Sequence, residues 1–208
     1  MIALILTDIQ NDFLPGGALA VNEGDAIIPV VNQVQPRYPL VVATQDWHPA
    51  NHGSFAANHP GRKVYDQIDL NGLPQTLWPI HCVQHTRGAE LSPALDPSRI
   101  ARVFQKGTDP SIDSYSAFFD NGHRRATGLG DWLKGQGVHE VHLGGLTTDY
   151  CVKFSALDAA ALGFKTRVIL DACRGVNLNP SDVDNAIAEM KHAGVQILHV
   201  SDMPIQVD

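Results

Sequence analysis

The sequence predicts a three-layer α/β/α sandwich built around a mostly parallel sheet of about six strands. Two observations lead to this prediction: short aliphatic runs recur along the chain, and helical patterns lie between several of them. Strands that are apolar along their whole length are typical of a parallel sheet covered by helices on both faces. The chain has 208 residues, of which 44% are apolar, so we expect a single domain over residues 1–208.

In chain order, strand and helix patterns alternate, and right-handed crossovers would place the helices on both faces of the sheet. The predicted strands are Ile2–Thr7, Leu40–Thr44, Ala101–Phe104, Val138–Leu143, Thr166–Leu170 and Val195–Val200. The predicted helices are Asp25–Gln35, Gly130–Gln136, Val152–Leu162 and Ser181–Ala193. The segment at about 46–97 breaks the alternation, because it is rich in Pro, Gly, Asn and His and has little periodicity. We expect an irregular, functional excursion there that binds metal and substrate.

The composition argues against several classes of function. The net charge is −7 and there is no basic cluster, which argues against a nucleic-acid partner. No run is long enough to span a membrane, and the first apolar run lacks the basic lead of a signal peptide, so we expect no membrane association. Cys82, Cys151 and Cys173 form neither a disulfide framework nor a zinc pattern, which fits a cytoplasmic setting. We expect Cys82 and Cys173 to be packing residues.

The segment Gly144–Val152 is the most informative part of the chain. A predicted strand leads into its glycines and a predicted helix follows, with Thr147, Thr148 and Asp149 as candidate N-caps. Cys151 would then lie in the first turn of a helix, where backbone N–H groups and the helix dipole stabilise a thiolate. This pattern predicts a nucleophile beside an oxyanion hole. The alternative is a small residue that packs the helix against the sheet.

Polar side chains follow several of the predicted strands. Active sites of parallel sheets lie beyond the carboxyl ends of the strands, and Asp8, Asp46, Lys106 and Cys151 all occupy such positions. Lys106 would stabilise the thiolate, and Asp8 would take the thiol proton and pass it to a leaving amine. The alternatives are a turn-capping role for Asp8 and a solvated surface position for Lys106.

Asp46 and His48, together with the distant His81, indicate a metal site. One carboxylate and two imidazoles suit zinc, iron or manganese with open coordination positions. The alternative is that Asp46 caps a turn and that both histidines are ordinary loop residues. Other polar residues near this loop are His52, Ser54, His59 and His85.

Loop aromatic residues near these groups can stack on a planar substrate. The candidates are Phe13, Trp47, Trp78 and Tyr115. The alternative is packing beneath the excursion.

Taken together, these motifs resemble those of the isochorismatase-like cysteine hydrolases and, within that superfamily, the nicotinamidase/pyrazinamidase family. The motifs occur in the order of the family, at fitting spacing, along nearly the whole chain. They are Thr7–Phe13 (TDIQNDF), Asp46–Pro49 (DWHP), Trp78–Val83 (WPIHCV), Phe104–Gly107 (FQKG), Asp113–Phe118 (DSYSAF) and Gly145–Val152 (GLTTDYCV).

The resemblance implies the isochorismatase-like hydrolase fold and an amidohydrolase that converts nicotinamide to nicotinate and ammonia in NAD salvage, with pyrazinamide as a second substrate. Asp8, Lys106 and Cys151 would be the catalytic residues, and the reaction would pass through a thioester. The backbone N–H groups of Thr147 and Cys151 would hold the oxyanion. The resemblance also implies a cis peptide bond between Leu146 and Thr147.

For the substrate pocket, the resemblance implies that Phe13 and Trp78 flank the pyridine ring and that Tyr115 closes the pocket. Tyr150, which replaces a histidine of some relatives, would tune it.

For the metal, the resemblance implies one Zn²⁺ or Fe²⁺ ion, with Mn²⁺ as a further option, bound by Asp46, His48 and His81. Ser54 stands where some relatives have an additional histidine, and it would contact the metal through a water molecule. His52 is a weaker candidate because it borders a Gly-Ser bend and the family does not require it.

Other functions remain open from the sequence. One is a related amidase that acts on a carbamoyl or ureido substrate, although the set of Asp46, His48 and His81 favours a pyridine carboxamide. Another is a metallohydrolase in which bound metal activates water and Cys151 is structural. A third is a non-enzymatic binding module with this fold. The sequence determines neither the metal nor the oligomeric state.

Overall fold

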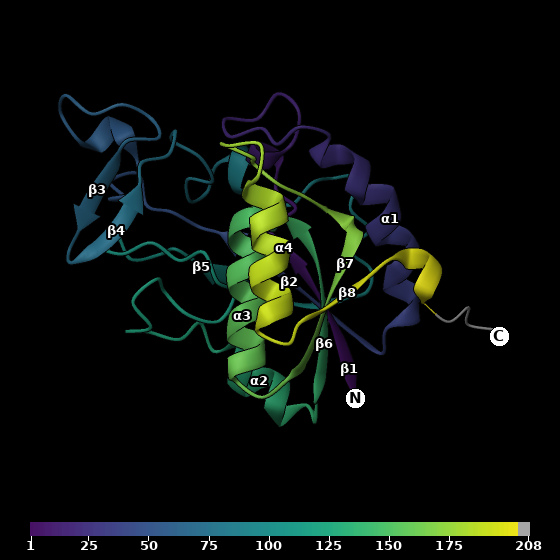
Figure 1. Cartoon of the computed structure of the whole chain (residues 1–208). Helices are drawn as coiled ribbons and strands as arrows, with labels where there is room; N and C mark the ends of the chain where they lie inside the picture. The colour runs from purple at the N-terminus through teal and green to yellow at the C-terminus, as the bar shows by residue number, and fades with distance from the viewer. Residues whose placement is uncertain (204–208) are drawn as a thin grey trace.

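The computed structural model describes residues 1–203 and contains a six-stranded sheet between two layers of helices (Figure 1). Its strands are β1 (Ile2–Thr7), β2 (Leu40–Asp46), β5 (Ile100–Lys106), β6 (Glu140–Leu146), β7 (Lys165–Arg174) and β8 (Gln196–Leu198). Their spatial order is β5-β2-β1-β6-β7-β8, and every neighbouring pair is parallel. The predicted fold class is therefore confirmed. The last residues of the predicted domain, 204–208, lie outside the described residues.

The helices cover both faces of this sheet. They are α1 (Ile27–Val34), α2 (Leu129–Gly135), α3 (Lys153–Ala161) and α4 (Asp182–His192). Figure 1 shows α3 and α4 side by side over one face, with α1 on the other. Because successive strand residues point to opposite faces, Leu4 and Leu6 of β1 pack in the core beneath α1, whereas Ala3 and Ile5 pack in the core beneath the other helices. This double burial explains why the strand runs are apolar throughout.

The connections create a switch point beside β1. The chain runs from β1 outward through β2 to β5 and then returns to β6 on the other side of β1. Ligands of open parallel sheets bind at such a point, beyond the carboxyl ends of the strands. Asp8 follows β1 directly, Asp46 and Lys106 are the last residues of β2 and β5, and Cys151 follows β6. The topology therefore brings these side chains to one edge of the sheet.

The segment 46–97 is more regular than predicted. It contains an antiparallel hairpin of β3 (Gln67–Leu70) and β4 (Leu73–Thr76), joined by Asn71 and Gly72. Both turn residues have positive φ angles, 54° and 87°, which an Asn-Gly pair accommodates in the tight turns of hairpins. The Asn-Gly pair was the available sequence signal for this hairpin.

The last strand is shorter than predicted. β8 ends at Leu198, and a 3-10 turn follows at Val200–Asp202. The carboxylate of Asp171 accepts a hydrogen bond from the Val200 N–H at 2.6 Å and lies 2.9 Å from Nδ1 of His199. Asp171 thus binds the backbone N–H of the residue that begins the 3-10 turn, where the prediction had continued the strand.

None of the helices within residues 1–203 is both long and apolar enough to cross a membrane.

Candidate active site

Lys106 lies at the centre of a buried cluster at the carboxyl edge of the sheet. Its Nζ atom is 2.9 Å from Oδ2 of Asp8 and 3.6 Å from Sγ of Cys151. It also donates hydrogen bonds to Oδ1 of Asp46 and, at 2.9 Å, to the carbonyl oxygen of Ser114. The structure thus brings Asp8, Lys106 and Cys151 together, and none of them is exposed to solvent beyond 5%.

Asp8 is held in place by a neighbouring strand. The hydroxyl group of Thr44 donates a hydrogen bond to Oδ1 of Asp8 at 2.6 Å, and the Asp8 N–H donates to the same hydroxyl oxygen at 3.2 Å. Burial raises the pKa of Asp8 above its ordinary value, although the Lys106 ammonium and the Thr44 hydroxyl oppose this shift. For Lys106, burial acts to lower the pKa, but the carboxylates of Asp46 and Asp8 raise it well above its ordinary value. Lys106 is therefore a fixed positive charge.

The turn that carries Cys151 differs in detail from the prediction. A π-helical turn spans Thr148–Val152 before α3 begins, and no side chain caps it. The carboxylate of Asp149 instead accepts hydrogen bonds from the backbone N–H groups of Val176 at 2.9 Å and Asn177 at 2.7 Å. The predicted capping role of Asp149 is wrong, because this side chain ties the turn that carries Cys151 to the loop after β7.

Opposing influences act on the pKa of the Cys151 thiol. Burial raises its pKa well above the ordinary value, and the nearby carboxylates of Asp8 and Asp46 raise it further, against the opposing charge of Lys106. This environment fits the expectation that Asp8 takes a proton from the thiol. The peptide bond between Leu146 and Thr147 is cis, as the family resemblance implied.

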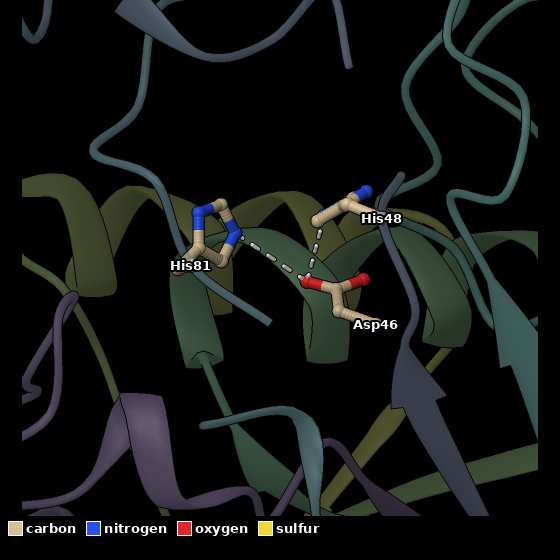
Figure 2. Close-up of side chains that lie close together, drawn as sticks. All are labelled: Asp46, His48 and His81. Atoms are coloured by element: carbon tan, nitrogen blue, oxygen red, sulfur yellow. Dashed lines mark ion pairs between the residues drawn. The ribbon is translucent and has the colours of Figure 1, made fainter. Parts of the chain in front are cut away.

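Asp46, His48 and His81 form a buried cluster whose side chains converge (Figure 2). Oδ2 of Asp46 is 3.6 Å from Nε2 of His48 and 3.8 Å from Nε2 of His81. The Nδ1 atoms of the two histidines lie 2.8 Å from the carbonyl oxygens of Gly107 and Pro79. Because a carbonyl oxygen only accepts, each Nδ1 carries the proton and each Nε2 lone pair faces Asp46. This tautomer and donor set fit a divalent transition metal.

One short backbone ladder aligns the loop that carries His48 with the segment that carries His81, and the side-chain amide of Gln10 holds the backbone of Asp46. The His48 N–H donates to the carbonyl oxygen of Cys82 at 3.0 Å, and the Gln84 N–H donates to that of His48 at 2.9 Å. On the other side, the amide of Gln10 donates to the carbonyl oxygen of Asp46 at 2.8 Å and accepts from the Asp46 N–H at 2.9 Å. These contacts fix residues that are far apart in the sequence.

Asp46 belongs to both clusters, which the sequence had presented as separate. One of its carboxylate oxygens accepts from Lys106, and the other faces His48 and His81. Burial acts to raise the pKa of Asp46, but the Lys106 ammonium holds it well below its ordinary value. Asp46 is therefore ionised.

A pocket opens above these groups, and most of the predicted site residues line it. Its lining consists of Phe13, Leu19, Asp46, His48, Trp78, His81, Asp113, Tyr115, Thr147, Tyr150, Cys151 and Val176. The rings of Trp78 and Tyr150 meet edge to face with centroids 4.8 Å apart, and Nε1 of Trp78 donates to the hydroxyl of Tyr115 at 3.2 Å. The walls are thus aromatic and mutually fixed, which suits a planar ligand.

The sequence reasoning missed Leu19, Asp113 and Val176 as lining residues. Asp113 heads one of the quoted motifs, so the sequence offered a signal for it. Leu19 and Val176 are aliphatic loop residues that carry no such signal.

Some candidates lie elsewhere. Nδ1 of His52 is 2.7 Å from the hydroxyl of Ser54 and accepts from the Ser54 N–H at 3.2 Å, and neither residue lines the pocket. The ring of Trp47 contacts His85, with centroids 5.3 Å apart. Both Cys82 and Cys173 are buried in hydrophobic clusters, as expected of packing residues. The contact of Ser54 with a metal-bound water stays a prediction.

A family model described as the isochorismatase domain matches residues 2–202. The chain belongs to the isochorismatase family. The resemblance drawn from the sequence motifs is therefore confirmed.

Several members of the isochorismatase family are close to this chain over almost its whole length. The chain is 54% identical to the nicotinamidase of Escherichia coli (strain K12), over 96% of this chain and 95% of that protein. A solved structure of the Acinetobacter baumanii nicotinamidase pyrazinamidase superposes with a TM-score of 0.94 at 46% identity and covers 97% of both chains. The pyrazinamidase of Pyrococcus horikoshii, solved in complex with zinc, has a TM-score of 0.77 at 39% identity, over 95% of this chain and 98% of that one.

Proposed function

We propose that this chain is an amidohydrolase that converts nicotinamide to nicotinate and ammonia, and pyrazinamide to pyrazinoate, through a thioester on Cys151. The observation that carries the proposal is the position of Lys106, 2.9 Å from Asp8 and 3.6 Å from the Cys151 sulfur, at the base of an aromatic pocket. The nicotinamidase of E. coli, at 54% identity, supports the choice of substrate.

The first half of the reaction forms the thioester. Asp8, paired with Lys106, accepts the thiol proton of Cys151 as the sulfur attacks the carboxamide carbon. The backbone N–H groups of Thr147 and Cys151 stabilise the oxyanion of the tetrahedral intermediate. When this intermediate collapses, the C–N bond breaks and Asp8 delivers its proton to the leaving nitrogen. Ammonia departs, and the acyl group remains on the sulfur.

The second half returns the enzyme to its starting state. A water molecule gives a proton to Asp8 and attacks the thioester carbon, and the same N–H groups hold the new oxyanion. Collapse breaks the C–S bond, and Asp8 returns its proton to the sulfur of Cys151. Lys106 keeps its charge throughout, so it favours the thiolate character that develops in each transition state.

Asp46, His48 and His81 would hold one Zn²⁺ or Fe²⁺ ion, or Mn²⁺, and the fixed tautomers of the two histidines support this ligand set. When bound, the cation supplies a Lewis-acid contact for the ring nitrogen of the substrate and thereby orients the ring. The zinc complex of the P. horikoshii pyrazinamidase supports the choice of zinc.

The aromatic residues orient the substrate and exclude water. Phe13 and Trp78 flank the ring, and Tyr115 and Tyr150 close the pocket around it. The hydroxyl of Thr147 has no hydrogen-bond partner among the described residues, although this residue lines the pocket. It is available to the carboxamide. The proposal places the whole chain, as one domain, in NAD salvage in the cytoplasm, where a reducing environment keeps Cys151 free.

Ammonia release from nicotinamide by the purified protein tests the proposal, with Cys151→Ala and the control Cys173→Ala measured beside it. We expect release by the wild type and by the control and none by Cys151→Ala. No release by a folded, zinc-loaded wild type would exclude nicotinamide as the substrate. Equal release by all three proteins would show that the thiol is not the nucleophile and that a metal-activated water performs the hydrolysis.

A further inference from the structure

Asp113 is a buried carboxylate without a cation. It is 3% exposed, and within residues 1–203 it forms no ion pair with a lysine, arginine or histidine. Its Oδ2 accepts a hydrogen bond from Nε2 of Gln75 at 3.0 Å, and its Oδ1 accepts from the Ser114 N–H at 2.8 Å. An ionised carboxylate taken out of water costs several kcal/mol unless a positive charge compensates it. The proposed mechanism gives Asp113 no role.

Asp113 lines the same pocket as Asp46, His48 and His81. One of its oxygens lies within 4.8 Å of a ring nitrogen of His48 and of His52. However, the donor atoms of Asp46, His48 and His81 all lie within 4.8 Å of one another, and Asp113 is not part of that set. Ligands on opposite sides of an ion with bonds of about 2.1 Å are only about 4.2 Å apart, so Asp113 is too far away for direct ligation. A bridging water would span that distance.

We propose that Asp113 is a further residue of the metal centre, whose carboxylate accepts a hydrogen bond from a metal-bound water and strengthens cation binding by its charge. This inference rests on the proposed metal site. A divalent cation would add positive charge to a buried cluster in which Lys106 already pairs with Asp8 and Asp46. Asp113 supplies a further acidic side chain in the same pocket, close to His48.

Gln75 orients this carboxylate. It is the third residue of β4 and is buried. Its Nε2 also donates to the backbone carbonyl of Thr76 at 2.7 Å and lies 3.1 Å from the hydroxyl of Tyr115. The amide nitrogen therefore contacts both the Asp113 carboxylate and a wall of the substrate pocket. This gives the β3–β4 hairpin a function: it supplies the donor that fixes the outer carboxylate of the metal centre.

The affinity of the protein for Zn²⁺, measured by competition with a chromophoric chelator, tests the inference without an activity assay. The variants are Asp113→Asn and the matched control Asp120→Asn. Asp120 is also buried and accepts backbone N–H groups, from Gly122 and Arg124 at 2.9 Å, but it does not line the pocket. We expect Asp113→Asn to weaken Zn²⁺ binding about 10- to 100-fold, and Asp120→Asn to leave it within about twofold.

The melting temperature of the metal-free proteins separates a metal role from a structural one. Because Asp113→Asn removes an uncompensated buried charge, its metal-free form should melt at or above the wild-type temperature. Zinc affinity within about twofold of wild type would overturn the inference. So would a weaker affinity that comes with a lower metal-free melting temperature, or an equal loss in Asp120→Asn. Asp113→Ser, which also removes the charge, provides the same test if the Asn variant does not fold.

Failure of the inference and failure of the proposed function are distinguishable. A wild-type protein that binds no Zn²⁺ overturns the inference, whatever its activity. A wild type that binds Zn²⁺ but does not hydrolyse nicotinamide overturns the proposed substrate, while the Zn²⁺ affinities of the Asp113 variants still decide the inference.

Discussion

Replacement of Lys106 by methionine would test how far one buried ammonium group holds the site together. Lys106 is 2% exposed and is the ionic partner of both Asp8 and Asp46. Methionine retains most of the volume but leaves two buried carboxylates without a counter-charge. Loss of one partner of a buried ion pair costs about 3–5 kcal/mol. At about 2–4 °C per kcal/mol for a domain of this size, we expect the melting temperature to fall by about 6–20 °C.

The assay is urea unfolding of the metal-free protein at pH 8 and at pH 5, with Lys153→Met as the control. Nζ of Lys153 pairs at 3.1 Å with Glu189, whose side chain is 56% exposed, so this loss should cost at most about 1 kcal/mol.

The effect of pH has a definite sign. In the wild type, Lys106 is the main group that holds the pKa of Asp46 well below its ordinary value of 3.8. The stabilisation of the folded state by Asp46 is therefore present above pH 3.8 and is lost as the pH falls through the pKa of the folded protein. In Lys106→Met, burial acts unopposed by Lys106 and raises the pKa of both carboxylates. The folded variant then binds protons more readily than its unfolded chain, so its deficit should shrink from pH 8 to pH 5. An unfolding free energy within about 1 kcal/mol of wild type at pH 8 would refute the reasoning.

Three further predictions concern the reaction and the metal. Thr44→Val removes a hydroxyl that lowers the pKa of Asp8, so the acid limb of the pH profile of kcat/KM should move to higher pH. Thr44→Ser keeps the hydroxyl and should retain the wild-type profile. Coincident profiles for Thr44→Val and the wild type would contradict this prediction. Gly107→Ala should reduce zinc retention after dialysis, because φ is +64° and the new Cβ would lie 2.6 Å from Nδ1 of His48. Gly128→Ala, at φ +89° with no atom within 4 Å, carries similar backbone strain without the clash and should retain zinc. Removal of the metal by a chelator should lower kcat/KM for nicotinamide, and zinc should restore it; full activity of the metal-free enzyme would contradict the orienting role of the cation.

The strand-end residues were predictable because they depend on topology. Parallel strands share one carboxyl edge, so Asp8, Asp46 and Lys106 had to come close once the apolar runs were recognised as a parallel sheet. The same rule placed Cys151 after β6. Only the type of each strand and its direction were needed, and both follow from uninterrupted apolar runs between helices.

Other features depend on contacts that no local pattern encodes. Asp149 looked like a helix cap, but its carboxylate bonds to the backbone of Val176 and Asn177 in the loop after β7. Helix capping competes with any backbone N–H that the fold brings near, and the loop lies 27 residues further along the chain. The bond between Gln75 and Asp113, 38 residues apart, could not be predicted for the same reason.

The feature that matters most for the mechanism is Asp46, which belongs both to the cluster around Lys106 and to the cluster with His48 and His81. Asp46 ends β2, which lies between β5, with Lys106 at its end, and β1, with Asp8 following. The order β5-β2-β1 therefore places one carboxylate between a lysine and a pair of histidines, and each of its oxygens serves a different cluster. In the proposed metal centre, a cation on the histidine side would draw charge away from the oxygen that faces Lys106. Lys106 would then be compensated less by Asp46 and would act more strongly on Asp8 and on the Cys151 sulfur. The strand order would thereby couple metal binding to the reactivity of the thiol through Asp46 alone.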